Sequence, residues 1–239
     1  RCHGHFLAYG GDLRALFAEL MGRSTGVCGG RGGSQHIHWH NLYSNGVQGG
    51  IVPIATGMAL AEKTKKSGAV VVVFMGDGTL GEGVIYEAFN MASLWQLPIL
   101  YVVENNHIAQ TTPTSMALAG SIRQRFEAFD IPCTELDTSV VQLIKETVMG
   151  LLHEVREQTS PRALVLNTAR FGPHSKSDDT RSEAELATLK TTRDPLTTLA
   201  KLIPEDTLKK IHEEVEAEVK TAFSLALADD PASWEDASA

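Results

Sequence analysis

The sequence predicts an α/β fold, in which a doubly wound, mostly parallel sheet is flanked by helices and followed by a helical C-terminal extension. Two apolar segments, 69–75 and 97–103, have the composition of parallel strands that are covered on both faces. Segments with apolar residues at helical spacing alternate with these strands along the chain. This alternation is typical of doubly wound α/β proteins.

The elements expected first are an amphipathic helix and, after it, a tight loop, because a run of glycines interrupts the helical pattern. In order, the first half of the chain should contain a helix over 13–21, a tight loop over 26–33, a small-residue helix over 55–65, a strand over 69–75, a helix over 84–95 and a strand over 97–103. The last three form a strand, helix, strand unit, so both strand ends should meet at one edge of the sheet.

The second half of the chain continues the alternation and then becomes more polar. It should contain a helix over 140–155, a short strand over 163–166, a polar loop over 176–193 that is mobile or ordered by a partner, an amphipathic helix over 208–223 and a loose acidic tail from Asp229. We therefore expect a binding domain over 1–193 and a helical extension with its tail over 194–239.

The composition describes a globular protein and excludes several functional classes. The chain has 239 residues, is 43% hydrophobic and 21% charged, and carries a formal net charge of -8, which gives no electrostatic reason to expect nucleic acid or an anionic membrane as a partner. Three cysteines without close pairing argue against a disulfide framework and for a reducing compartment. No apolar run is long enough to span a bilayer and no signal peptide opens the chain, so a cytoplasmic location is expected. Because Arg1 is not an initiator Met, an upstream segment is expected as well.

Candidate metal ligands follow both strands of the strand, helix, strand unit. Asp77 stands in a Gly-Asp-Gly motif after the first strand, and Asn106 completes an Asn pair after the second, 29 positions later. Ligands of open α/β sheets bind beyond the carboxyl ends of the strands, where unpaired amides face anions. Carboxylate and amide oxygens suit magnesium, with the Ile108 carbonyl as a candidate third ligand. Although Gly-Asp-Gly alone is common in turns, this spacing predicts a magnesium-bound diphosphate.

Further motifs make the chain similar to a known family over nearly its whole length. The motifs are RCHGH at 1–5, GRSTG at 22–26, GGSQH at 32–36, GDGTLGEG at 76–83, EAFNMA at 87–92, LWQLP at 94–98, ENN at 104–106 and RFGPHS at 170–175. In their order and spacing they resemble the alpha subunits of the decarboxylating component of 2-oxo acid dehydrogenase complexes, with acetoin dehydrogenase alpha subunits close by. The resemblance implies the thiamine-diphosphate-binding fold.

The resemblance also implies which residues hold thiamine diphosphate and its magnesium ion. Asp77, Asn106 and the carbonyl of Ile108 match the metal ligands, while Arg1 and Arg170 match residues that contact the diphosphate. Five further positions match cofactor-binding positions of the family, where most contacts do not depend on the side chain. Gly46 and Gln48 match contacts to the aminopyrimidine, and Gly76 opens the turn in which Gly78 and Thr79 supply amides near the diphosphate.

Two histidines are the catalytic candidates. His174 matches the active-site histidine of the family, on a loop near the reacting carbon, and would orient the substrate carboxylate or assist acyl transfer. His36 is the second candidate. The loop departs from the family pattern at Pro173, which should stiffen the approach to His174.

Other residues have simpler interpretations. His3, His5, His38 and His40 are interpreted as structural or channel residues, because the metal of this family takes oxygen ligands. Ser175 and Ser177 resemble regulatory phosphorylation positions of some organellar relatives, yet ordinary polar loop residues are the preferred interpretation.

The activity implied is the oxidative decarboxylation of a 2-oxo acid, with pyruvate first, and transfer of the acyl group to a lipoyl-bearing component. A beta subunit should complete the site in an alpha2-beta2 tetramer. Branched-chain 2-oxo acids stay open as substrates. Two alternatives stay open for the function, an acetoin-cleaving or specialised carboligating relative and a noncatalytic assembly subunit. Intact Asp77, Asn106 and His174 argue against the assembly subunit.

Overall fold

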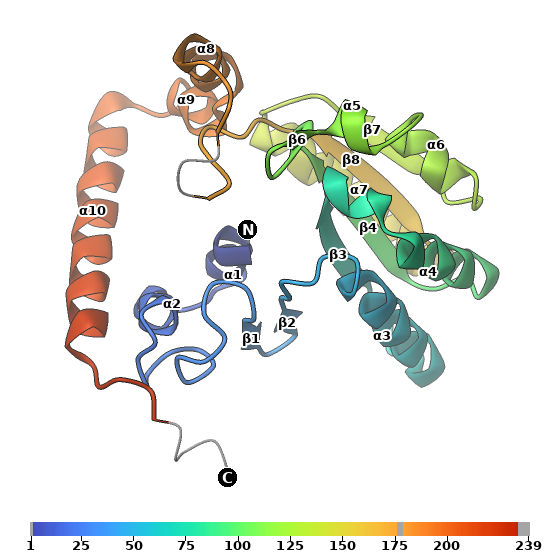
Figure 1. The fold of residues 1–239 in the computed structure, drawn as a ribbon, viewed down its shortest axis with the longest axis horizontal. Coiled ribbons are helices and arrows are strands. Elements are labelled where there is room, and N and C mark those ends of the chain that lie inside the picture. Colours follow the sequence, from blue (N-terminus) through green and yellow to red (C-terminus); the bar gives the residue numbers. More distant parts are fainter. Residues whose placement is uncertain (1, 176–178, 234–239) are drawn as a thin grey trace. The chain divides into compact units, whose positions relative to one another are not determined.

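The computed structural model describes residues 2–175 and 179–233 (Figure 1). The helices are α1 (Cys2–Ala8), α2 (Leu13–Leu20), α3 (Ile51–Lys65), α4 (Gly83–Leu94), α5 (Thr114–Ala117), α6 (Ile122–Glu127), α7 (Val141–Gln158), α8 (Glu183–Arg193), α9 (Pro195–Ala200) and α10 (Glu205–Ala228), with the 3-10 turn η1 (Asp77–Gly81). The strands are β1 (His38–Trp39), β2 (Leu42–Tyr43), β3 (Val71–Gly76), β4 (Ile99–Asn105), β5 (Ile108–Ala109), β6 (Thr112–Pro113), β7 (Cys133–Leu136) and β8 (Arg162–Asn167).

The chain divides into two compact units. The first contains residues 1–47 and 203–239, and the second contains residues 48–202. The division expected from the sequence, 1–193 and 194–239, stays a prediction.

The second unit contains a four-stranded sheet in the order β3-β4-β8-β7, and all neighbouring pairs are parallel. On one face, apolar residues of α3, α4 and α6 pack against the sheet, including Val52, Phe89 and Phe126. On the other face, Leu151 and Val155 of α7 pack against β4 and β8. A parallel sheet with helices on both faces confirms the expected α/β fold (Figure 1).

The strand β3 lies at one edge of this sheet, and its two faces differ. Val73 and Met75 are buried under the helices, whereas Val72 and Phe74 are 37% and 40% exposed. The apolar composition predicts that helices cover both faces of β3. Among the described residues, they cover only one. The edge position accounts for the difference, because α7 packs over the more central strands.

The first unit is mainly helical and contains the β1-β2 hairpin. In it α10 packs along α2, with the rings of Phe17 and Phe223 in an edge-to-face contact at 5.6 Å. The buried carboxylate of Glu19 accepts hydrogen bonds from four backbone amides of the glycine-rich loop, those of Cys28, Gly30, Gly32 and Gly33. The expected helix over 13–21 and the loop after it are thus present, and a buried charge organises the loop.

Two expectations for the polar segments were wrong. Residues 183–193 form the helix α8 instead of a loop, because Ser182 caps the first turn and charges of the favourable sign lie near both helix ends. The described part of the tail, 229–233, is held in place, since Asp229 pairs with Arg14 at 2.6 Å and Pro231 forms a β-bridge with Arg23. Within the described ranges, no helix has the length and apolarity to cross a bilayer.

Candidate functional site

The candidate site lies at the carboxyl ends of β3 and β4 in the second unit. These strands are paired in register, with Gly76 opposite Glu104 at their ends. Asp77 follows β3 as the first residue of η1, and Asn106 follows β4 directly. The sheet thus brings the ends of two segments, 29 positions apart in sequence, to one edge, as the motif spacing predicts.

The Asp77 side chain is a buried carboxylate at this edge. Asp77 is 2% exposed, and Thr114, the first residue of α5, donates its hydroxyl hydrogen bond to Oδ2. No ion pair to Asp77 is found within the described part of the chain. A buried carboxylate is costly unless a cation or several donors compensate it. The surroundings of Asp77 are therefore suited to a bound cation.

The β5-β6 hairpin approaches η1 closely at Gly78. A Cβ placed on Gly78 would lie 2.3 Å from the Cβ of Ala109, so a side chain there would collide with the hairpin. This contact involves the residues next to Asp77 and Ile108. The hairpin and η1, which carry two of the three expected metal ligands, thus touch through a position that requires glycine.

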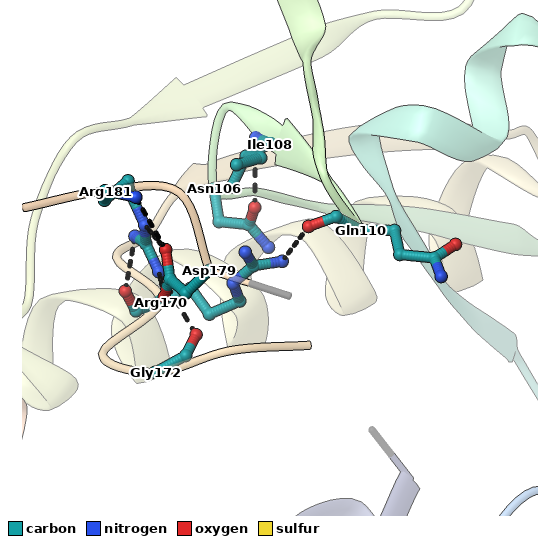
Figure 2. A network of polar contacts seen from close by, with 7 residues as sticks. All are labelled: Asn106, Ile108, Gln110, Arg170, Gly172, Asp179 and Arg181. Atoms are coloured by element: carbon teal, nitrogen blue, oxygen red, sulfur yellow. Dashed lines mark hydrogen bonds and ion pairs between the residues drawn. The ribbon is translucent and has the colours of Figure 1, made fainter. Parts of the chain in front are cut away.

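Asn106 fixes the start of the same hairpin. Its side-chain oxygen Oδ1 accepts a hydrogen bond from the amide of Ile108 at 3.1 Å (Figure 2). An amide oxygen has two lone pairs, so this bond leaves one for a metal ion. The neighbouring Asn105 donates a hydrogen bond from Nδ2 to Oδ1 of Asn167 at 2.7 Å. This bond connects the ends of β4 and β8.

Arg170 supplies a partly buried positive charge near the hairpin. Its Nη1 donates to the carbonyl of Gln110 at 2.9 Å, and Figure 2 shows the guanidinium directed toward that turn. Nε and Nη2 are buried and have no hydrogen-bond partner in the described structure. Unpaired buried donors on a cation are costly, which suits a site that takes an anion.

The loop that begins at Arg170 is held at its base by Arg181. The Arg181 guanidinium donates to the carbonyls of Arg170 and Gly172, at 2.7 and 3.1 Å, and forms a two-pronged ion pair with Asp179 at 2.9 and 2.8 Å (Figure 2). The hydrogen bonds from Arg181 lower the pKa of Asp179 to about 2. Asp179 is consequently ionised over the physiological pH range.

His174 lies on this loop. It is exposed, and its Nδ1 lies 3.0 Å from the hydroxyl oxygen of Ser175. Ser177 falls within residues 176–178, outside the described residues.

The remaining site candidates fall in different parts of the chain. Gln48 opens the second unit, and the amide of Gly49 beside it donates to the carboxylate of Glu82 at 2.9 Å. Gly46 and His36 belong to the first unit, where a Cβ on Gly46 would lie 3.4 Å from Nε2 of His36. Arg1 lies outside the described residues.

Several residues that contribute to the site could not be identified from the sequence motifs. Thr114, Ala109 and Arg181 each act through a contact with a motif residue, and neither their type nor their spacing distinguishes them in the sequence. The one sequence signal is the Asp-Thr-Arg order of 179–181 in a polar segment, which permits a local ion pair. Among the described residues, no group of three or more His, Cys, Asp and Glu side chains is placed to hold a metal ion.

Comparison with known proteins identifies related sequences. The family model "Dehydrogenase E1 component" matches residues 1–233. The chain is 36% identical over 237 residues to the pyruvate dehydrogenase E1 component subunit alpha of Zymomonas mobilis, covering 95% of this chain and 67% of the relative. The proteins of the same name from Rickettsia bellii and Rhizobium meliloti are each 36% identical, over 238 and 241 residues, covering 95% and 96% of this chain and 73% and 69% of the relatives.

Proposed function

The chain belongs to the dehydrogenase E1 component family, and from this membership we propose that it is the alpha subunit of a thiamine-diphosphate-dependent dehydrogenase that decarboxylates pyruvate. The names of the relatives support pyruvate among the 2-oxo acids. Membership implies dependence on thiamine diphosphate. The family and fold expected from the motifs are thereby confirmed.

The observation that carries the proposal is that one end of the sheet carries both a buried carboxylate and a guanidinium with two unpaired buried nitrogens. Asp77 is 2% exposed, and two buried guanidinium nitrogens of Arg170 lack partners in the described structure. A diphosphate with a divalent ion would satisfy both, because Asp77 would bind the ion and Arg170 would donate to the phosphate oxygens. The residues present therefore fit the cofactor.

Magnesium is the ion that these ligands favour. Asp77, Asn106 and the carbonyl of Ile108 offer three oxygens of different types, and magnesium takes its remaining ligands from phosphate and water. Thr114 orients the Asp77 carboxylate through its hydroxyl. The lack of a side chain at Gly78 allows η1 to lie close to the hairpin that contains Ile108.

The remaining residues of the site would position the cofactor and the substrate. The amides of Gly78 and Thr79, with Gly76 before them, would face the diphosphate, and the backbone of Gly46 and Gln48 would contact the aminopyrimidine. His174 would bind the substrate carboxylate or hold a proton during acyl transfer, with His36 as a second candidate. When bound, thiamine diphosphate supplies the electron sink for decarboxylation. The protein contributes orientation and a fixed electrostatic field.

The alpha subunit requires partners for the complete reaction. We propose a beta subunit that completes the cofactor site in an alpha2-beta2 tetramer, and a lipoyl-bearing acyltransferase component that accepts the acyl group. We also propose a cytoplasmic location. Arg1 is proposed as a second cation for the diphosphate.

The proposal is tested with the chain produced alone and together with its beta subunit. Thiamine diphosphate and magnesium are titrated into both samples, and a panel of pyruvate, branched-chain 2-oxo acids and acetoin is then assayed with an artificial electron acceptor. We expect tight magnesium-dependent binding in the assembled sample and the highest kcat/KM for pyruvate. Absence of binding in both samples would refute a cofactor-binding role, and preference for acetoin would refute the assigned substrate.

A further inference from the structure

A chain of partly buried hydrogen bonds connects η1 to α4 and α6 of the second unit. Tyr86 of α4 bonds through its hydroxyl to the carbonyl of Leu80 in η1. Arg125 of α6 bonds to the same hydroxyl through Nη1, and its Nη2 donates to the carbonyl of Ala119. The turn that carries Asp77 is thereby connected to two helices.

The direction of these hydrogen bonds is fixed by chemistry. A guanidinium only donates, so the Tyr86 oxygen must accept from Arg125. A carbonyl only accepts, so the single hydroxyl proton of Tyr86 must point to Leu80. The positive charge on Arg125 polarises the hydroxyl and strengthens the bond that it donates. The hydrogen-bonded chain therefore has one arrangement.

Packing holds the Tyr86 ring in place. The ring is stacked on Phe129 with a centroid distance of 6.2 Å and meets Phe89 edge to face at 6.0 Å. The Arg125 guanidinium carbon lies 5.7 Å from the ring centroid of Tyr86, within the range of a cation–π contact. Leu80 itself is fully buried. The hydroxyl thus contacts the turn from a rigid position.

The η1 turn is expected to be weakly held by its own hydrogen bonds. It is a 3-10 turn of five residues, and hydrogen-bond geometry in 3-10 structure is poorer than in an α-helix. Its end is closed by a bond from the amide of Glu82 to the carbonyl of Thr79 at 3.0 Å. An external donor to Leu80 restricts the turn further, because it satisfies a carbonyl near the end of η1.

We propose that Tyr86, held by Arg125, is a positioning residue for the cofactor turn: it fixes the Leu80 carbonyl and so the conformation in which η1 presents Asp77 and the following amides. The identity of the ligand rests on the proposed function, whereas the support of η1 does not. Tyr86 touches no reacting atom in this role. Its effect is on the affinity for the magnesium-bound diphosphate.

The clean variant is Tyr86→Phe, which removes one oxygen and keeps the packed ring. Tyr101→Phe is the matched control, because Tyr101 is a buried tyrosine whose hydroxyl lies 3.5 Å from Thr56 and not in the chain of bonds to η1. Two measurements are made on both variants and the wild type. One is titration of thiamine diphosphate and magnesium into the chain assembled with its beta subunit, in which both binding and the rate of pyruvate decarboxylation are followed. The other is amide hydrogen exchange of the chain without cofactor.

For Tyr86→Phe we expect the apparent KM for thiamine diphosphate to rise roughly fivefold with kcat at saturation close to wild type, as loss of one hydrogen bond implies. Amides of 77–82 should exchange faster without cofactor, and Tyr101→Phe should change neither quantity. Arg125→Met should weaken binding as well, and the double variant Tyr86→Phe/Arg125→Met should show less than the product of the two effects, because both act through Leu80.

The possible failures are distinguishable. If the wild-type assembly binds thiamine diphosphate and Tyr86→Phe matches the wild type in binding and exchange, the positioning role of Tyr86 is wrong and the proposed function stands. If the wild-type assembly binds no thiamine diphosphate, the proposed function is wrong, and the role of Tyr86 at a cofactor site is overturned with it.

Discussion

The guanidinium of Arg181 holds the main-chain carbonyl of Arg170, with 2.7 Å between Nη1 and the carbonyl oxygen. A second bond from Arg181 to the carbonyl of Gly172 fixes the next turn of the chain. The residue expected to bind the diphosphate and the loop that carries His174 thus share one support. This support lies in the second unit and involves side chains that the family motifs do not contain.

The first prediction concerns Arg181. Replacement by Lys keeps the charge and loses the fork that reaches two carbonyls and Asp179 together, so kcat/KM should fall roughly tenfold, in line with the loss of hydrogen bonds to a charged group. The loss should appear in kcat, because the loop that carries His174 is loosened. Arg156→Lys, at an exposed contact to Gly68, is the control and should have wild-type kinetics. Wild-type kinetics in Arg181→Lys would show that the loop holds its position without the fork.

A second prediction follows from the pKa of Asp179, which the bonds from Arg181 lower from 3.8 to about 2. A group whose folded pKa is depressed contributes stability above its unfolded pKa and loses it as the pH falls through the folded value. The difference in Tm between the wild type and Asp179→Asn should therefore be constant above pH 3.8 and shrink toward pH 2. Thermal unfolding over this range measures it. A difference independent of pH would argue against the ion pair.

Gly78 provides a third test. Because an added Cβ would lie 2.3 Å from the Cβ of Ala109, Gly78→Ala should push the hairpin away from η1 and weaken magnesium-dependent cofactor binding by more than tenfold, as misplacement of a metal ligand implies. Gly57→Ala is the matched control. Nothing lies within 4 Å of its added Cβ, and this helical position should gain about 0.5–1 kcal/mol of stability.

The double variant Gly78→Ala/Ala109→Gly makes the third test specific. Removing the Cβ of Ala109 relieves the collision, so cofactor affinity should recover toward wild type. Failure to recover would mean that Gly78 is needed for its contact with the ligand and not for the space beside Ala109.

The fourth prediction concerns the bond between Gly49 and Glu82. This bond links the start of α3, next to Gln48, to the residue that follows η1. Glu82→Ala should raise the KM for thiamine diphosphate a few-fold, as expected for one hydrogen bond, while Glu82→Gln, which keeps an acceptor oxygen, should recover most of the affinity.

Gly49→Ala should imitate Glu82→Ala, because its Cβ would lie 2.2 Å from Oε2 of Glu82 and would displace the carboxylate. The control is Gly83→Ala, whose added Cβ meets no atom within 4 Å. Wild-type affinity for thiamine diphosphate in both Gly49→Ala and Glu82→Ala would show that this bond does not contribute to cofactor binding.

The strands, and the end of the sheet at which the site lies, could be predicted from the sequence because they depend on local patterns of apolar and polar residues. The apolar segments 69–75 and 97–103 correspond to β3 and β4, displaced by about two residues, and the polar residues after them do lie at adjoining strand ends. Helix α8 was missed because its capping residue, Ser182, and its terminal charges compensate for a weak apolar face. Local patterns thus predicted elements wherever burial dominates.

The side-chain contacts that hold the site residues in place could not be predicted from the sequence, for a different reason. Tyr86, Arg125 and Leu80 meet only after α4 and α6 have packed on the sheet, and no spacing rule connects residues 39 positions apart. Similarly, the contact of Thr114 with Asp77 depends on the path of a hairpin. Side-chain contacts of this kind are fixed by tertiary packing, which a motif does not encode.

Asp77 is proposed to bind the magnesium ion that holds the diphosphate. The most direct measurement is titration of thiamine diphosphate, with and without magnesium, into the assembled wild type and into Asp77→Ala. We expect magnesium-dependent binding in the wild type and none in Asp77→Ala, with the unfolding transition of the variant retained. Magnesium-dependent affinity in Asp77→Ala equal to that of the wild type would contradict it.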